Sequence, residues 1–223
     1  METVFKDFND RKNEIELYVN FIKLSENNDL IYDEVNKNGI NKLELRRIFL
    51  ANAYLLLYNL VESTIRNTIQ EIYDHLKLKN VSFDVLKPNI KKTILQGLKA
   101  KNPSKIVDEF ETIAADIISI SFDPDKISDG NIDARKIREI AQNYCFSDMT
   151  DFSKCKNGEK LFEIKNKRNN LSHGIVSFSE CGRQISISDL NLAFIEATSY
   201  LESILGNVKV YLNTEAYLFS ESA

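Results

Sequence analysis

The sequence has few of the residues that interrupt helices, with 7 glycines and 3 prolines among 223 residues. Because both residue types mark turns and breaks, their scarcity favours long helices over many short strands. Hydrophobic residues make up 43% of the chain and charged residues 28%, which is ordinary for a globular protein. We therefore predict an all-α protein with residues 1–223 as a single domain, in which residues 79–157 are an insertion or elaboration.

Signals for membrane insertion and secretion are also missing. No uninterrupted apolar run reaches the roughly 20 residues that a membrane span requires. The N-terminus lacks the basic stretch followed by an apolar stretch that is typical of a signal peptide. Cys145, Cys155 and Cys181 are an odd set without CxxC spacing, which indicates free thiols in a reducing compartment. We expect a cytoplasmic protein with no membrane contact.

Several common kinds of catalytic centre have no counterpart in the sequence. Two histidines and scattered cysteines give no cluster with the spacing of metal ligands. No glycine-rich phosphate loop of the form GxxxxGK[ST] is present. We therefore expect neither a metal nor a cofactor. The net charge of −4 argues against non-specific coating of nucleic acid, so any such contact must come from local basic patches.

Apolar periodicity and helix-end signals predict most of the secondary structure. Asp133 and Asp189 suit the N-caps of two helices, and Gly174 suits the position after the C-cap of another. Two short alternating stretches, residues 175–178 and 183–187, predict a small β-hairpin. The predicted helices cover residues 3–26, 41–78, 83–101 (with Pro88 near the start or at a break), 102–119, 133–144, 158–173 and 189–213.

The segment that says most about function is Arg-Asn-Asn-Leu-Ser-His, residues 168–173, where a predicted helix ends. Leu161, Ile164 and Leu171 have the spacing of a buried helical stripe, and Arg168 falls on the same stripe. A charged guanidinium on an apolar face is unfavourable unless it is paired or faces a cleft. Arg168 is therefore a candidate site residue from its position alone.

An arginine and a histidine together can cleave RNA without a metal. The planar fork of Arg168 suits a phosphate, and His173 can exchange a proton near neutral pH. The histidine would remove the proton from a ribose 2′-OH or protonate the departing 5′ oxygen, while the arginine would stabilise the phosphate charge. Since acid and base roles usually need two groups, a twofold dimer that brings two Arg/His pairs into one cleft would supply both.

Three further residues are candidates for supporting roles. Asn169 and Asn170 are poor helix formers inside a helix, which indicates a polar role for at least one of them. Glu62 lies on a polar stripe of the helix predicted over residues 41–78 and can orient the Arg168 guanidinium. The alternative for Glu62 is a surface ion pair with Arg66, four residues later.

A basic block precedes the motif and suggests where RNA would bind. Lys165 and Lys167 are candidate phosphate contacts, and Arg183 lies in the segment after the motif, where it can contact RNA. The alternative for the lysines is a solvated helix edge, and for Arg183 ordinary hairpin chemistry. The corresponding alternative for His173 is a C-capping role without catalysis.

Residues 168–173 closely resemble the Arg-x4–6-His signature of the HEPN superfamily, and residues 55–63, 128–133 and 173–183 resemble its prokaryotic MAE-type subgroup. The resemblance implies a HEPN-like helical bundle with additional helices that dimerises through its motif helices. It also implies Arg168 and His173 as catalytic residues, with Asn169 and, less directly, Glu62 beside them. A role in toxin–antitoxin or phage-defence biology, with an antitoxin or regulatory protein as partner, is part of the same implication.

We therefore expect a metal-independent endoribonuclease whose products carry 2′,3′-cyclic phosphate and 5′-hydroxyl ends. A different class of function is also open, namely a non-catalytic HEPN module that binds RNA, a nucleotide or a partner protein. A third is a helical scaffold in which Arg168 and His173 join a dimer interface.

Overall fold

The computed structural model describes residues 1–27, 39, 41–99, 117–123 and 130–220. Within these residues the chain is helical and forms no β-strand, with only an isolated bridge between Leu86 and Leu218. The prediction of an all-α fold is thus confirmed. The main helices are α1 (Glu2–Asn27), α3 (Lys42–Leu78), α4 (Pro88–Lys99), α6 (Ile117–Ser121), α7 (Ala134–Tyr144), α8 (Phe152–Cys155), α9 (Glu159–Ser172), α10 (Phe178–Arg183) and α11 (Ile187–Asn213).

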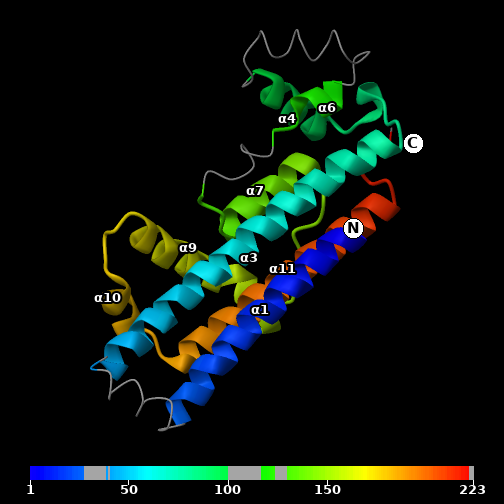
Figure 1. The fold of residues 1–223 in the computed structure, drawn as a ribbon. Coiled ribbons are helices and arrows are strands. Elements are labelled where there is room, and N and C mark those ends of the chain that lie inside the picture. Colours follow the sequence, from blue (N-terminus) through cyan, green and yellow to red (C-terminus); the bar gives the residue numbers. More distant parts are fainter. Residues whose placement is uncertain (28–38, 40, 100–116, 124–129, 221–223) are drawn as a thin grey trace.

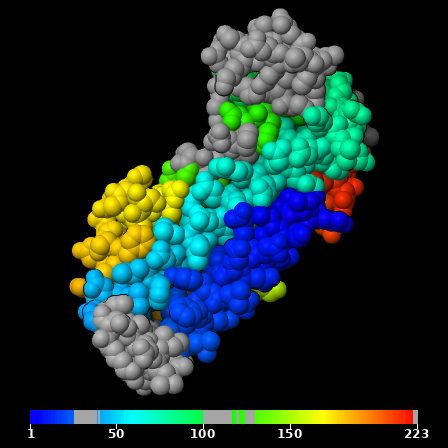
Figure 2. Space-filling model, viewed as in Figure 1, coloured from blue at the N-terminus to red at the C-terminus, as the bar shows by residue number. Residues whose placement is uncertain are grey.

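Three long helices, α1, α3 and α11, lie side by side and form the body of the molecule (Figure 1). α1 runs antiparallel to α3. The amino group of Met1, at the start of α1, pairs with Glu71 near the end of α3, and the Tyr18 hydroxyl donates to the carbonyl oxygen of Phe49 in the first half of α3. In Figure 2, α1 lies along the surface of an elongated body, and the motif helix α9 and α10 lie beside the first half of α3.

The centre of the fold is α3, which packs against α1, α9, α10 and α11. Contact on several sides requires apolar residues around most of the helix, and Leu50, Tyr54, Leu57 and Tyr58 are all fully buried. By length and composition α3 also meets the criteria for a membrane span, but 56% of its most apolar window is buried inside the fold. The central helix of a soluble protein meets the same criteria.

The helix ends follow the capping signals of the sequence, with one correction. The Asp133 side chain accepts a hydrogen bond from the Lys136 backbone and caps α7, as predicted. The prediction that Asp189 caps the last helix was wrong, since Ser186 is the N-cap of α11. Asp189 instead accepts from the Ser186 backbone N–H in a capping box, which satisfies two helix-end donors reciprocally.

The predicted β-hairpin after the motif is wrong, because residues 178–183 form the short helix α10. Ser177 and Glu180 make a complete capping box that begins this helix. Gly182 is buried against α3, where a Cβ atom would come within 1.9 Å of the carbonyl oxygen of Arg47. A glycine at this position therefore allows a close helix–helix contact.

Between α3 and α9, the described residues form short helices. A 3-10 turn at Phe83–Val85 precedes α4, which begins at Pro88, so the helix predicted from residue 83 is broken there. Most of the helix predicted over residues 102–119 lies outside the described residues, and α6 includes its end. α8 and a 3-10 turn at Lys156–Gly158 lie between α7 and α9.

Candidate active site at the end of helix α9

The motif lies at the C-terminal end of α9, whose buried stripe is the one predicted from the sequence. Leu161, Ile164 and Leu171 are 1%, 0% and 6% exposed. The helix ends at His173, whose backbone N–H donates to the carbonyl oxygen of Asn169 over 3.0 Å. Gly174 follows with φ of +65°, the left-handed conformation expected after a C-cap. The stripe fixes which side of α9 faces α3.

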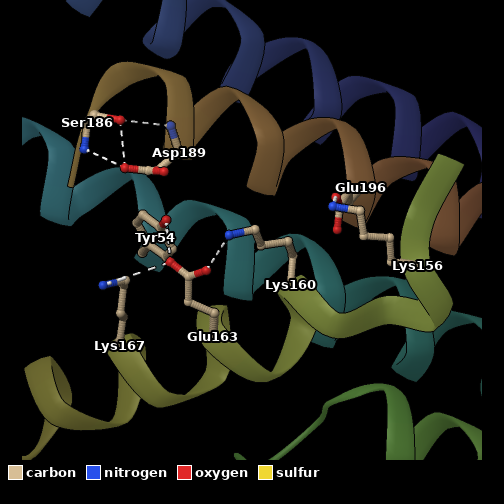
Figure 3. A network of polar contacts seen from close by, with 8 residues as sticks. All are labelled: Tyr54, Lys156, Lys160, Glu163, Lys167, Ser186, Asp189 and Glu196. Carbon is tan, nitrogen blue, oxygen red and sulfur yellow. Dashed lines mark hydrogen bonds and ion pairs between the residues drawn. The ribbon is translucent and has the colours of Figure 1, made fainter. Parts of the chain in front are cut away.

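A polar network strengthens the contact between α9 and α3 (Figure 3). The buried Tyr54 hydroxyl donates to Glu163 Oε1 over 2.9 Å, and Lys160 Nζ donates to Oε2 over 2.7 Å. Lys167 Nζ lies 3.9 Å from the same carboxylate. Burial, together with the Glu163 carboxylate, raises the pKa of Tyr54 far above its ordinary value, so its hydroxyl stays a donor. These contacts fix the position of α9, and with it the motif, relative to α3.

Arg168 is held by contacts that leave part of its guanidinium accessible. Nη1 donates to the carbonyl oxygen of Gly130 and to Asn169 Oδ1, each over 2.9 Å. Nη2 lies 3.8 Å from Glu62 Oε2, and the arginine side chain is 25% exposed. The sequence-based expectation that an arginine on the apolar stripe must be paired agrees with this geometry.

The Tyr58 ring packs against the guanidinium of Arg168, a contact that the sequence did not predict. Arg168 Cζ lies 4.3 Å from the ring centroid, which is a cation–π distance. The Tyr58 hydroxyl accepts from the backbone N–H of Ile132 over 3.2 Å, so the same side chain also holds the segment before α7. Its position four residues before Glu62 on α3 was the available signal.

Gly130 is the second residue that sequence reasoning did not assign to the site. Its φ is +78°, and a Cβ atom there would lie 2.9 Å from Nη1 and 3.2 Å from Nη2 of Arg168. Glycine therefore meets both a conformational and a spatial requirement. The next residue, Asn131, accepts a hydrogen bond at Oδ1 from Asn169 Nδ2 over 2.9 Å. The segment before α7 thus braces two consecutive motif residues.

His173 differs from Arg168 because its side chain is exposed. Among the residues that the structure describes, no hydrogen bond or ion pair engages its imidazole, although its backbone caps α9. Neighbouring Ser172 donates its hydroxyl to the Arg168 carbonyl oxygen over 2.7 Å, inside the helix. The imidazole is therefore available for a substrate or for a second protein chain.

The two candidate lysines point to partners within the chain. Lys165 Nζ lies 2.5 Å from Asp133 Oδ2 and 4.9 Å from the Phe162 ring centroid. Lys167 Nζ lies 5.2 Å from the Tyr54 ring centroid, in addition to its contact with Glu163. A phosphate bound by either ammonium group would have to share it with these partners, so their role in RNA binding stays a prediction.

The remaining candidates, Asn170 and Arg183, are exposed and line one pocket of about 350 Å³ together with Lys167. The Glu180 carboxylate, which also lines the pocket, accepts hydrogen bonds from the backbone N–H and the hydroxyl of Ser177, and these bonds, with the nearby Arg183 charge, lower its pKa. Asn170 also accepts the Ile175 N–H at its backbone oxygen, which shapes the turn after the motif. The structure therefore places these polar groups beside the motif, between α9 and α10.

The described residues contain no group of three or more His, Cys, Asp and Glu side chains positioned to hold a metal. The end of α9 carries a fixed guanidinium, an exposed imidazole and two asparagine side chains. That combination can bind an oxyanion and exchange a proton.

The chain as a whole matches a known family. A family model described as MAE_28990-like HEPN matches residues 1–217. The chain belongs to the MAE_28990-like HEPN family. No curated protein and no solved structure matches it. In this HEPN protein the helical fold agrees with the family, and because HEPN domains are often ribonucleases, the match directs attention to the Arg168–His173 segment.

Proposed function

We propose that this HEPN protein is a metal-independent endoribonuclease with Arg168 and His173 as its catalytic residues. The observation that carries the proposal is the contrast within the motif. Arg168 is fixed by Gly130, Asn169 and Tyr58 while a quarter of its side chain stays exposed, and the exposed imidazole of His173 has no partner among the described residues. A rigid anion-binding group beside a free acid–base group is the arrangement that RNA cleavage through the 2′-OH needs.

The reaction follows from the chemistry of these two groups. The neutral imidazole removes the proton of the 2′-OH, whose oxygen attacks the adjacent phosphorus. The guanidinium binds the non-bridging oxygens and stabilises the charge that develops on them. The bond to the 5′ oxygen breaks, and that oxygen leaves with a proton from an imidazolium. The products are a 2′,3′-cyclic phosphate and a 5′-hydroxyl, and DNA does not react by this route.

A second copy of the chain completes the proposed site. One strand cleavage needs a base and an acid, and each chain supplies one histidine in the motif. Two large apolar side chains on the surface precede and follow the motif in the sequence, Phe162 at 57% exposed and Ile175 at 67% exposed. Their burial would favour a twofold interface along α9 that brings two motifs into one cleft. The proposed biological role is a toxin or phage-defence effector restrained by an antitoxin or regulatory protein.

The decisive experiment incubates purified protein with labelled structured RNA in EDTA and maps the product ends, beside His173→Ala. We expect cyclic-phosphate ends from the parent protein and a loss of rate of about 10²-fold or more in the variant. Because His173 is exposed, we expect the variant to unfold at the same temperature as the parent protein. A thermal unfolding measurement with that result would exclude misfolding as the cause of the lost activity. Activity that survives both His173→Ala and Arg168→Ala contradicts the proposal. Binding of RNA without any cleavage favours the non-catalytic module.

A further inference from the structure

A second polar cavity, separate from the pocket between α9 and α10, lies between α7 and the start of α9. Its volume is about 490 Å³, and three carboxylates contribute to its lining. The cations that line it outnumber them by two, although the chain as a whole is acidic with a net charge of −4. These cations are Arg135, Lys136, Arg138, Lys156 and Lys165. A local positive excess on an acidic protein is the electrostatic signature of an anion-binding surface.

The lysines and the arginines of this pocket are engaged differently. The lysines all have carboxylate partners, namely Glu139 for Lys136, Glu196 for Lys156 and Asp133 for Lys165. By contrast, neither Arg135 nor Arg138 has an ion pair with any residue that the structure describes.

Arg138 donates to the carbonyl oxygen of Asn157 over 3.2 Å through Nη1. Arg135 is exposed. Two guanidinium groups without carboxylate partners therefore line the pocket, and guanidinium forks suit phosphate oxygens.

The pocket adjoins the candidate active site through two residues. Asn131 lines the pocket, and its side chain accepts from Asn169, the neighbour of Arg168 in the chain. Lys165 lines the pocket too and precedes Arg168 by three residues, about one turn of α9. An extended strand with one phosphate at Arg168 can therefore continue across Asn131 into the pocket.

We propose that this pocket binds a second phosphate of a single-stranded RNA substrate, next to the phosphate held at Arg168. The inference rests on the proposed ribonuclease function and adds the direction in which the strand runs, from the motif toward α7. Arg135 and Arg138 contact the phosphate. The lysines stay in their intramolecular ion pairs and contribute to the positive electrostatic potential of the pocket.

The first test measures binding in EDTA with the His173→Ala protein, which does not consume the ligand. Fluorescence anisotropy with a labelled single-stranded oligoribonucleotide gives the affinity at several salt concentrations. Adding Arg135→Gln should weaken binding by about threefold to tenfold and reduce the salt slope by roughly one counterion. Lys92→Gln, which removes an exposed positive charge on α4, is the matched control and should change neither. Arg135→Gln and Arg135→Glu proteins that bind like the parent, or a parent that binds no RNA, overturn the inference.

A second test separates this inference from the ribonuclease proposal. With His173 intact, Arg135→Gln should raise KM for an oligoribonucleotide. It should leave the cleavage of a dinucleoside monophosphate unchanged, because this substrate has a single phosphate and cannot reach the second site. Cleavage that depends on His173 but is insensitive to Arg135 on both substrates rejects the pocket and keeps the ribonuclease. RNA binding that depends on Arg135 without any cleavage rejects the ribonuclease and keeps the pocket.

Discussion

Arg168 and His173 lie on consecutive turns at the end of α9, yet their surroundings differ in almost every respect. The guanidinium has two hydrogen bonds, a carboxylate 3.8 Å away and an aromatic ring beneath it. The imidazole is exposed and engages no described residue. The fold thus fixes the group that binds charge and leaves free the group that moves a proton.

This difference has a physical rationale. A fixed guanidinium stabilises transition-state charge without the reorganisation that a mobile side chain would need at the moment of reaction. A histidine must meet the 2′-OH or the leaving oxygen, and its proton exchange needs contact with solvent. Changes around Arg168 should therefore affect both stability and activity, whereas a change at His173 should affect activity alone.

Gly130→Ala should have the largest effect among changes to the supports of Arg168. The new methyl group overlaps Nη1 and Nη2, and the residue must keep a left-handed conformation. We expect kcat/KM to fall by about tenfold or more, because the guanidinium must leave its observed position to relieve the short contact with Nη1. Thermal unfolding should show a destabilisation of about 1–2 kcal/mol.

The control for this change is Gly39→Ala, which also has a positive φ, of +71°, but where no atom of the described residues lies within 4 Å of the added methyl group. It should show the backbone strain without the loss of activity. An active Gly130→Ala protein would mean that Arg168 does not need its observed position.

Much of the fold could be predicted because long amphipathic helices leave a repeated signal in the sequence. The limits of α1, α3 and α9 follow from that signal. The hairpin predicted after the motif failed because alternation over so few residues is weak evidence, while the Ser177–Glu180 capping box stood in the same segment. A local end signal was thus more informative than a short apolar pattern.

The site was predictable only in part, for a related reason. Arg168 was identified because a charge on a buried stripe is visible within one helix. Gly130 and Tyr58 were not, because they meet Arg168 from 38 and 110 residues earlier in the chain, and only the folded structure shows such contacts. The sequence reveals that an arginine must be paired, but not which backbone oxygen and which ring support it.

Glu62→Gln should have a smaller effect that sharpens the same comparison. The carboxylate lies 3.8 Å from Arg168 Nη2 and equally far from Arg66 Nη2, so it acts on these two arginines through its charge more than through a directed hydrogen bond. We expect kcat to fall by less than about tenfold and stability to change by less than about 1 kcal/mol. Steady-state kinetics and urea unfolding measure the two effects.

Arg66→Gln is the matched control, since it removes the ion pair between Arg66 and Glu62 and leaves Arg168 in place. If it reproduces the loss of activity, the role of Glu62 lies in its pair with Arg66 and not in orienting the motif arginine.

Asp133→Asn should have the smallest effect on activity and a clear effect on stability. Burial raises the pKa of Asp133, but hydrogen bonds from Lys165 and from the backbone of Lys136 more than offset it, so the net shift is downward. The ionised carboxylate therefore stabilises the fold fully above its ordinary pKa of 3.8, and this stabilisation is lost as the pH falls through the lower folded value.

At pH 7 the Asp133→Asn protein should be less stable by about 1–2 kcal/mol, and urea unfolding should show the gap closing as the pH falls below about 4. Asp151→Asn is the control, because Asp151 also caps a helix but is exposed and faces the exposed Lys154. It should cause a smaller loss. If the Asp133 gap persists in acid, the carboxylate acts through its shape and not through its charge.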